Sequence, residues 1–340
     1  MEDLATYLKS IGFAIHIVPL VSNEYDRSLK SRIFNLQLFR FINLLWTIRR
    51  IKPEIVHGFD LESGIYSAAA RMLLGVKKFK LLSGFGSGFV KDKRIRFLFQ
   101  QNWLMPELFI GNSKKGVNEL KAILRKPESV LLIRNGLDTV RLDAMVLIES
   151  NFEEKLKNNR VVGYIGKLDN VKHGERMLEL AMEMLGEKGG HDKPLFVIMG
   201  DGPNRQAMEK KLAALPRSVQ ERVLVMGNVK HAGRLARYFD IGILCSDSEG
   251  YPNVLLEYMH FGIPWVSTDV GDVVEISDNG NTGFVLETWN AKEFAQTCTN
   301  ILANEALCTK MSNEGPEIFN RKHSIETMSL NYVQVYNGLD

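Results

Sequence analysis

The stretch from Ser246 to Glu275 decides the fold, and it reads SDSEGYPNVLLEYMHFGIPWVSTDVGDVVE. The apolar run 241–245 precedes it and is typical of a buried strand. After a polar loop, Asn253 is the predicted N-cap of a helix that Gly262 ends, and a second apolar run follows. This strand-loop-helix-strand unit is typical of an open parallel α/β sheet, in which ligands bind beyond the carboxyl ends of the strands.

Two glutamates flank the loop, Glu249 and Glu257, and they are eight positions apart. Their spacing alone means little, because chance produces many such pairs and most are solvated acids. The residues that stand at set offsets around them carry more information: Gly250, Pro252, Asn253, Gly262, Pro264, Gly271 and Glu275. Together these residues resemble the signature of the retaining glycosyltransferases of family 4, which have the GT-B fold.

The resemblance implies a role for each glutamate. Glu249 would lie against the donor sugar, and Glu257 would hydrogen-bond the ribose hydroxyls of the nucleotide. Residues 227–229 resemble the loop that frames the base with its backbone. The donor-binding residues implied are therefore Gly250, Tyr251, Pro252, Asn253, Glu257, Gly227 and Asn228.

Two lysines follow the predicted strand 161–165 at the spacing where the family has Arg and Lys. In the family these cations bind the donor diphosphate, so the resemblance implies that Lys167 and Lys172 act with Glu249 in catalysis. Lys167 in place of Arg keeps the charge but loses the two-pronged guanidinium. His173 stands where Gly is usual.

The acceptor side is expected in the first half of the chain. His57 ends the predicted strand 53–58 and resembles a family position at the acceptor cleft, although a structural hydrogen bond explains a lone histidine equally well. Gly86 and Ser87 belong to the loop 84–89, which resembles a glycine-rich variant among polysaccharide-building members. Its glycines would let backbone N–H groups approach a phosphate or a sugar, and the alternative is a plain turn.

The resemblance covers nearly all of the 340 residues and implies two Rossmann-like domains that face a cleft. We expect an acceptor-side domain, an irregular linker, a nucleotide-sugar domain and a terminal helix that packs back on the first domain: residues 1–138, 139–159, 160–320 and 321–340. The chain starts at a predicted helix and the strand 13–20. The family's usual first strand and Gly-rich loop are therefore expected to be missing.

Composition excludes some other classes. The apolar fraction of 45% is ordinary for a globular core, and no apolar run approaches the ~20 residues of a membrane span. The acidic start is unlike a signal peptide. The three cysteines form no metal-ligand pattern, which indicates reduced thiols in a cytoplasmic protein.

Charge is unevenly distributed along the chain. Residues 1–138 hold 22 Lys and Arg against 12 Asp and Glu, whereas the remainder holds 21 against 28. Residues 28–52 predict a basic amphipathic helix, and residues 91–103 repeat its composition. Such a helix can pack on the core with a solvated basic face, or it can lie on an anionic membrane surface. We expect no nucleic-acid partner, since no single-strand-binding motif accompanies these stretches.

The resemblance implies transfer of a hexose from a nucleoside diphosphate sugar, with retention at the anomeric carbon. The partners would be the nucleotide-sugar donor and a glycan or lipid-linked acceptor in polysaccharide assembly. We expect neither a metal nor another cofactor, and a cytoplasmic location, alternatively peripheral on the inner face of the plasma membrane. Two alternatives stay open: a sugar-nucleotide epimerase of the same fold, and a non-catalytic nucleotide-sugar-binding partner of another transferase.

Overall fold

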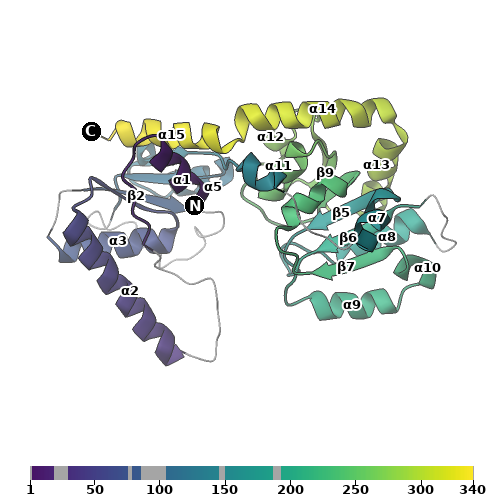
Figure 1. Ribbon diagram of the computed structural model, residues 1–340, viewed down its shortest axis with the longest axis horizontal. Coiled ribbons are helices and arrows are strands. Elements are labelled where there is room, and N and C mark those ends of the chain that lie inside the picture. The colour runs from purple at the N-terminus through teal and green to yellow at the C-terminus, as the bar shows by residue number, and fades with distance from the viewer. Residues whose placement is uncertain are drawn as a thin grey trace. The chain divides into compact units, whose positions relative to one another are not determined.

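The computed structural model describes residues 2–18, 30–75, 79–85, 105–144, 150–186 and 193–339 (Figure 1). They form two compact units. The N-terminal unit combines Met1–Arg134 with Met328–Asp340, and the C-terminal unit is Asn135–Thr327. Each unit contains a parallel sheet, which confirms the predicted α/β class.

The described sheet of the N-terminal unit has four strands in the order β1-β2-β3-β4. All of its pairs are parallel, so each strand returns through a connection on a face of the sheet. The elements are α1 Glu2–Ser10, α2 Lys30–Ile51, β1 Ile55–Gly58, α3 Leu61–Leu73, β2 Lys80–Phe85, β3 Leu108–Gly111, α5 Lys114–Lys121, the 3₁₀ turn Pro127–Ser129 and β4 Val130–Leu132.

Local sequence explains how these helices begin and where they pack. Asp60 caps α3 through its carboxylate, which accepts from the Ser63 N–H at 2.6 Å, while the Asp60 N–H donates to the Ser63 hydroxyl. In α2, Leu44 and Ile48 are four residues apart and buried, because this spacing puts both on the face toward the core.

The C-terminal unit has a six-stranded parallel sheet in the order β10-β9-β8-β5-β6-β7. Its elements are α6 Thr139–Asp143, α7 Ser150–Lys157, β5 Val161–Ile165, α8 Arg176–Leu185, β6 Leu195–Met199, α9 Arg205–Ala213, α10 Arg217–Gln220, β7 Val223–Gly227, the 3₁₀ helix η4 Ala232–Tyr238, β8 Ile241–Leu244, α11 Asn253–His260, β9 Trp265–Thr268, α12 Val273–Ile276, β10 Gly283–Leu286, α13 Ala291–Ala303 and α14 Glu305–Lys322. A last helix, α15 Ile325–Asn337, begins in this unit and continues into the N-terminal unit.

The strand order fixes where a ligand can bind. From β5 the chain builds outward through β6 and β7, and then returns to place β8 on the other side of β5. The direction of winding therefore reverses between β5 and β8. At such a switch point, the loops beyond the two neighbouring strands diverge to opposite faces and leave a crevice.

Buried strands hold the sheet of this unit. All five residues of β6 are buried, as expected for a strand that is covered by helices on both faces. Gly262 ends α11 as predicted, with a φ of +65° and the Ser312 carbonyl oxygen 2.5 Å from where a Cβ would lie. A side chain there would meet both backbone strain and a backbone clash.

Three sequence predictions differ from the structure. Residues 13–18 are irregular where a strand was predicted, because they take part in no strand pairing among the described residues, and residues 19 and 20 lie outside those residues. The linker 139–159 is not irregular throughout, since α6 and α7 form in it; Asp138 caps α6 by accepting from the Arg141 N–H. The terminal helix predicted at 321–340 begins later, since α14 ends at Lys322 and α15 runs from Ile325 to Asn337. Among the described residues, no helix is both long enough and apolar enough to cross a bilayer.

Candidate functional site

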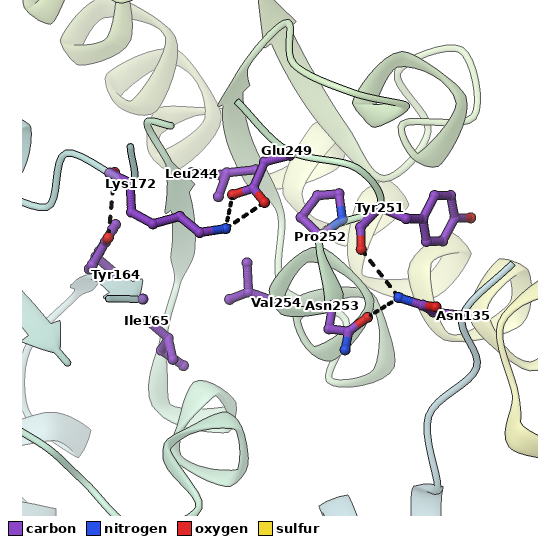
Figure 2. Close-up of a pocket in the computed structure, with 11 residues that line it drawn as sticks. Asn135, Tyr164, Ile165, Lys172, Leu244, Glu249, Tyr251, Pro252, Asn253 and Val254 are labelled. Carbon is purple, nitrogen blue, oxygen red and sulfur yellow. Dashed lines mark hydrogen bonds and ion pairs between the residues drawn. The ribbon is translucent and has the colours of Figure 1, made fainter. Parts of the chain in front are cut away.

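A pocket of about 320 Å³ lies at the carboxyl ends of β5 and β8, where the winding of the C-terminal sheet reverses. Every residue that lines it belongs to the C-terminal unit. Its walls come from the loop after β5, the loop after β8 and the first turn of α11 (Figure 2). The lining residues are Asn135, Tyr164, Ile165, Gly166, Lys172, Leu244, Glu249, Tyr251, Pro252, Asn253 and Val254.

The structure brings Lys172 and Glu249 together across this pocket. Figure 2 shows the lysine reaching from the β5 loop to the carboxylate, and Nζ lies 2.5 Å from both Oε1 and Oε2. Glu249 is buried, and the Ser246 hydroxyl also donates to its Oε1 at 2.7 Å. The buried carboxylate is therefore neutralised and hydrogen-bonded, as a buried charge requires.

The loop that carries Lys172 is held in shape by its own backbone. The Asp169 carboxylate accepts from the N–H groups of Val171 and Lys172, which closes a local turn. Burial alone would raise the pKa of Asp169, but these N–H groups and the nearby Lys167 hold that pKa below its usual value. Gly200 lets the next loop come close, because a Cβ there would lie 1.8 Å from the Gly166 carbonyl oxygen.

A second bridge joins the same two loops beside the first. His173 has a φ of +51°, and its Nε2 lies 2.8 Å from the Asp247 carboxylate. Its Nδ1 lies 2.8 Å from the Glu175 carboxylate, and Arg176 also pairs with Asp247 at 2.7 Å. Two consecutive residues of the β5 loop, 172 and 173, are thus tied to two residues of the β8 loop.

The first turn of α11 lines another wall. The helix begins at Asn253 with Pro252 at the N-cap, so the prediction that Asn253 caps it is wrong. The Asn253 side chain accepts instead from Asn135 Nδ2 at 2.8 Å. Asn135 Nδ2 also donates to the Tyr251 carbonyl oxygen at 3.4 Å (Figure 2). Because Pro252, Asn253 and Val254 line the pocket, the N-terminal end of α11 borders it, and a helix N-terminus favours an anion.

Glu257 lies one turn deeper in α11 and does not line the pocket. Its carboxyl group packs on Gly233 of η4, where a Cβ would come within 2.6 Å of the Glu257 Cδ. Burial raises the pKa of Glu257 to about 7. Gly233 is the neighbour that leaves room for this carboxyl group.

Four other predicted donor residues lie outside the pocket wall. Lys167 is well exposed, and its Nζ pairs with Asp169 at 3.4 Å. Gly250 offers its carbonyl oxygen to the Asp272 N–H at 3.1 Å. Gly227 ends β7 with a φ of +67°, and Asn228 after it is exposed. A role for these residues in binding stays a prediction.

On the predicted acceptor side, His57 is the last residue but one of β1 and lies among aromatic rings. Its Nδ1 lies 2.9 Å from the Tyr336 hydroxyl, and its ring stacks on Phe59 with centroids 4.2 Å apart. Burial lowers the pKa of His57 to about 3, so the imidazole is neutral at ordinary pH. These contacts make His57 a packing residue of the N-terminal unit, and its acceptor role stays a prediction. Gly86 and Ser87 lie outside the described residues.

Sequence reasoning missed some members of this site. Asn135 had a visible signal, because it belongs to an Asn-Gly pair, which is typical of a turn. Ser246 and Asp247 had none, because their roles depend on where the β5 loop arrives. The predicted free cysteines are confirmed: Cys245 and Cys298 are buried and Cys308 is partly buried. Among the described residues, no three His, Cys, Asp or Glu side chains are grouped as metal ligands.

Comparison with known proteins identifies the region that holds this pocket. Residues 159–304 match the family model of the glycosyl transferases group 1. The N-acetyl-alpha-D-glucosaminyl L-malate synthase of Bacillus anthracis is 23% identical over 297 residues, which cover 85% of this chain and 75% of the relative. An Escherichia coli relative, UDP-Gal:alpha-D-GlcNAc-diphosphoundecaprenol alpha-1,3-galactosyltransferase, is 24% identical over 293 residues, or 82% of this chain and 74% of its own.

Solved structures extend the likeness to nearly the whole chain. The crystal structure of Anabaena HepE in complex with UDP superposes with a TM-score of 0.74 at 17% identity, covering 98% of this chain and 88% of that one. Its identity is too low to indicate more than the fold. The chain therefore has the GT-B fold of glycosyltransferases, and its residues 159–304 match the glycosyl transferases group 1.

Proposed function

We propose that this protein is a retaining glycosyltransferase that transfers a hexose from a nucleoside diphosphate sugar to a glycan or lipid-linked acceptor. The observation that carries the proposal is the Lys172–Glu249 pair in the pocket at the switch point of the C-terminal sheet. A cation and a carboxylate there suit a ligand that has an anionic diphosphate next to a neutral sugar.

The pocket wall suggests how the donor binds. Lys172 and the N-terminal turn of α11 supply positive charge from two sides, which is the arrangement that a diphosphate needs. HepE has been crystallised with UDP and with UDP-glucose, and the E. coli relative is named for UDP-Gal. Uridine diphosphate sugars are therefore the first donors to test.

The reaction would proceed with charge developing on the leaving diphosphate. The bond between the anomeric carbon and the phosphate oxygen breaks, the acceptor hydroxyl oxygen bonds to the same face of that carbon, and its proton leaves with the nucleoside diphosphate. Lys172 would stabilise the leaving oxygen as it gains charge. Glu249, held by Ser246, would orient sugar hydroxyls, and Glu257 would accept from the ribose. The proposal includes no metal, since Lys172 and α11 supply the positive charge.

The setting proposed is the cytoplasmic side of a membrane that carries the acceptor. The E. coli relative is named for a diphosphoundecaprenol acceptor, which is a lipid-linked sugar. The relatives are named as enzymes that build glycosidic products, which does not favour an epimerase or a non-catalytic partner.

A two-stage experiment tests the proposal. First, thermal unfolding with UDP, GDP and ADP sugars identifies the donor, because a ligand that binds the folded state raises the unfolding temperature. Next, the donor is incubated with lipid-diphosphate sugars, and the anomeric configuration of the product is read by NMR. The expected result is an α-linked product from an α-linked donor. An inverted product would rule out retention, and conversion of the donor sugar without an acceptor would identify an epimerase.

A matched variant separates binding from chemistry. In Lys172→Met the side-chain length is kept and the charge is lost, so both donor affinity and transfer should fall. Lys193 provides the control, since its Nζ donates to the Met184 carbonyl outside the pocket and Lys193→Met should leave both unchanged. Equal behaviour of the two variants would contradict the proposed donor site.

A further inference from the structure

Helix α2 has two apolar faces, and only one of them is used by the core. Leu44 and Ile48 face inward and are each 5% exposed. Four other apolar side chains, which recur every three or four residues along the helix, face outward. Its members are Leu38, Phe39, Ile42 and Trp46, which are 50%, 69%, 53% and 57% exposed. Exposure of such a stripe to water costs free energy. Single scattered apolar residues are normal on a protein surface, but a contiguous set marks an interaction site.

The charged residues of the segment that carries this stripe all have one sign. The sequence contains no Asp or Glu between Arg27 and Pro53. Arg49 and Arg50 are exposed at the end of the helix, and the Arg50 guanidinium lies 4.9 Å from the centroid of the Trp46 ring. Arginines at a helix C-terminus also suit its dipole, but that explanation leaves the exposed aromatic rings unexplained.

We propose that this outward face of α2, formed by Leu38, Phe39, Ile42, Trp46, Arg49 and Arg50, lies on the surface of an anionic lipid bilayer. The apolar rings and aliphatic chains would enter the boundary between headgroups and acyl chains, and the arginines would contact lipid phosphates. This inference goes beyond the proposed function, because it uses no residue of the donor pocket.

The charge pattern favours a bilayer over other occupants. A second copy of α2 would bring more arginines and no acidic residue of its own to balance them. A nucleic acid would pair with the arginines but offers no apolar layer for Leu38 and Ile42. Figure 1 places α2 and α15 at opposite edges of the N-terminal unit, so α15 does not cover this face.

Flotation of the full chain with vesicles tests the proposal. Vesicles of phosphatidylcholine with phosphatidylglycerol should carry the protein upward at low salt, whereas vesicles of phosphatidylcholine alone should carry much less. High salt should weaken the binding, because it screens exposed charges. Failure to bind the anionic vesicles at low salt would overturn the proposal.

Matched variants assign the binding to this face. Phe39→Ser with Trp46→Ser should lower partitioning at least about tenfold, because two large apolar side chains are lost. Val274→Ser is the control, since Val274 is 56% exposed and lies in the C-terminal unit. Loss of partitioning in the control, or none in the double variant, would overturn the assignment.

The arginines are tested in the same way. Arg49→Gln with Arg50→Gln should lower partitioning roughly thirtyfold at low salt, since each arginine near an anionic surface contributes about fivefold. Arg217→Gln is the control, because the Arg217 side chain is 90% exposed on the other unit. Unchanged partitioning of the Arg49 and Arg50 variant would remove the electrostatic part of the proposal.

Insertion of Trp46 can be measured directly. Vesicles with brominated acyl chains should quench the emission of the parent protein, and Trp46→Phe should bind as well as the parent while losing most of that quenching. Quenching that persists in Trp46→Phe would place another tryptophan at the membrane. Sedimentation equilibrium completes the test: a dimer that the Phe39 and Trp46 variant abolishes would assign this face to a second copy instead.

Discussion

The loop after β8 and the helix α11 each carry a glutamate, and the two carboxyl groups meet opposite surroundings. Glu249 in the loop is buried against Lys172 and Ser246, so its charge is balanced before any ligand arrives. Glu257 in the helix packs on Gly233, and burial raises its pKa to about 7. Eight residues of sequence therefore separate a carboxylate held by a cation from a carboxyl group that sits between its two protonation states near neutral pH. We therefore expect Glu249 to act where charge develops during the reaction, and Glu257 to bind hydroxyl groups of the ligand.

The strongest way to break this comparison is to remove the cation. Lys172→Met should lower transfer at least about a hundredfold, because positive charge that meets a developing anion typically contributes that much. It should also lower the free energy of unfolding by about 2 kcal/mol, since Glu249 keeps only Ser246 as a partner. Urea unfolding and single-turnover transfer measure the two effects.

The double variant Lys172→Met with Glu249→Gln is the control for that experiment. It removes both charges, so stability should return while transfer stays low. If transfer recovered together with stability, Lys172 would serve only to neutralise Glu249.

Nucleotide affinity should separate the two glutamates. Glu257→Ala should weaken UDP binding about ten- to a hundredfold, the value of a hydrogen bond to a charged group. Glu249→Ala should leave UDP affinity unchanged or higher, because it frees Lys172 from its present partner while it lowers transfer. Calorimetry with UDP measures both, and equal losses of affinity would refute the division of roles.

The pH dependence of Glu257 sharpens the same comparison. Its pKa is raised from 4.5 to about 7, so the folded state holds its proton more tightly than the unfolded state. The contribution of Glu257 to the free energy of unfolding should therefore be greatest below about pH 4.5. This contribution should be lost as the pH rises through about 7. Glu257→Gln should lose this dependence, which melting temperatures across the range will show.

Ionisation of Glu257 should raise the affinity for UDP, whereas it lowers the stability. If the ionised carboxylate accepts from the ribose, affinity in the parent protein should increase severalfold as the pH passes about 7. The Glu257→Gln variant corrects for titration of the UDP phosphate itself. An identical pH profile of UDP affinity in parent and variant would show that the Glu257 carboxylate does not contact the nucleotide.

The smallest expected effect concerns the second bridge between the two loops. His173→Gly relieves the positive φ but removes the hydrogen bonds to Glu175 and Asp247. We expect the KM for the donor to rise about three- to tenfold with little change in kcat, and stability to fall by less than about 1 kcal/mol. His173→Asn, which tolerates the same backbone but is too short to reach both carboxylates, should resemble the glycine variant. A fall in kcat alone would mean that His173 acts on the chemistry.

Much of the C-terminal unit could be predicted from sequence. Its buried strands are apolar runs between loop signals, and the predicted strand 161–165 is β5 residue for residue. In the N-terminal unit, the prediction of a strand at 13–20 was wrong, because apolar residues form a strand only when a neighbouring strand pairs with their backbone. The predicted cap at Asn253 was wrong, because the Asn253 side chain accepts from a distant partner, Asn135, and the helix begins at Asn253 itself. The Lys172–Glu249 pair was expected only through family resemblance, since it joins residues 77 positions apart.

The division of the chain also has a consequence for how the protein is made. The C-terminal unit is one continuous segment, Asn135–Thr327, and it holds every residue that lines the pocket. The N-terminal unit is completed only by Met328–Asp340, the segment that holds the His57 partner Tyr336. During translation the C-terminal unit can therefore fold first, because the Tyr336 partner of His57 is encoded 279 codons downstream of His57. A chain that stopped before Met328 would keep the unit that holds the pocket and would lack the segment that completes the N-terminal unit.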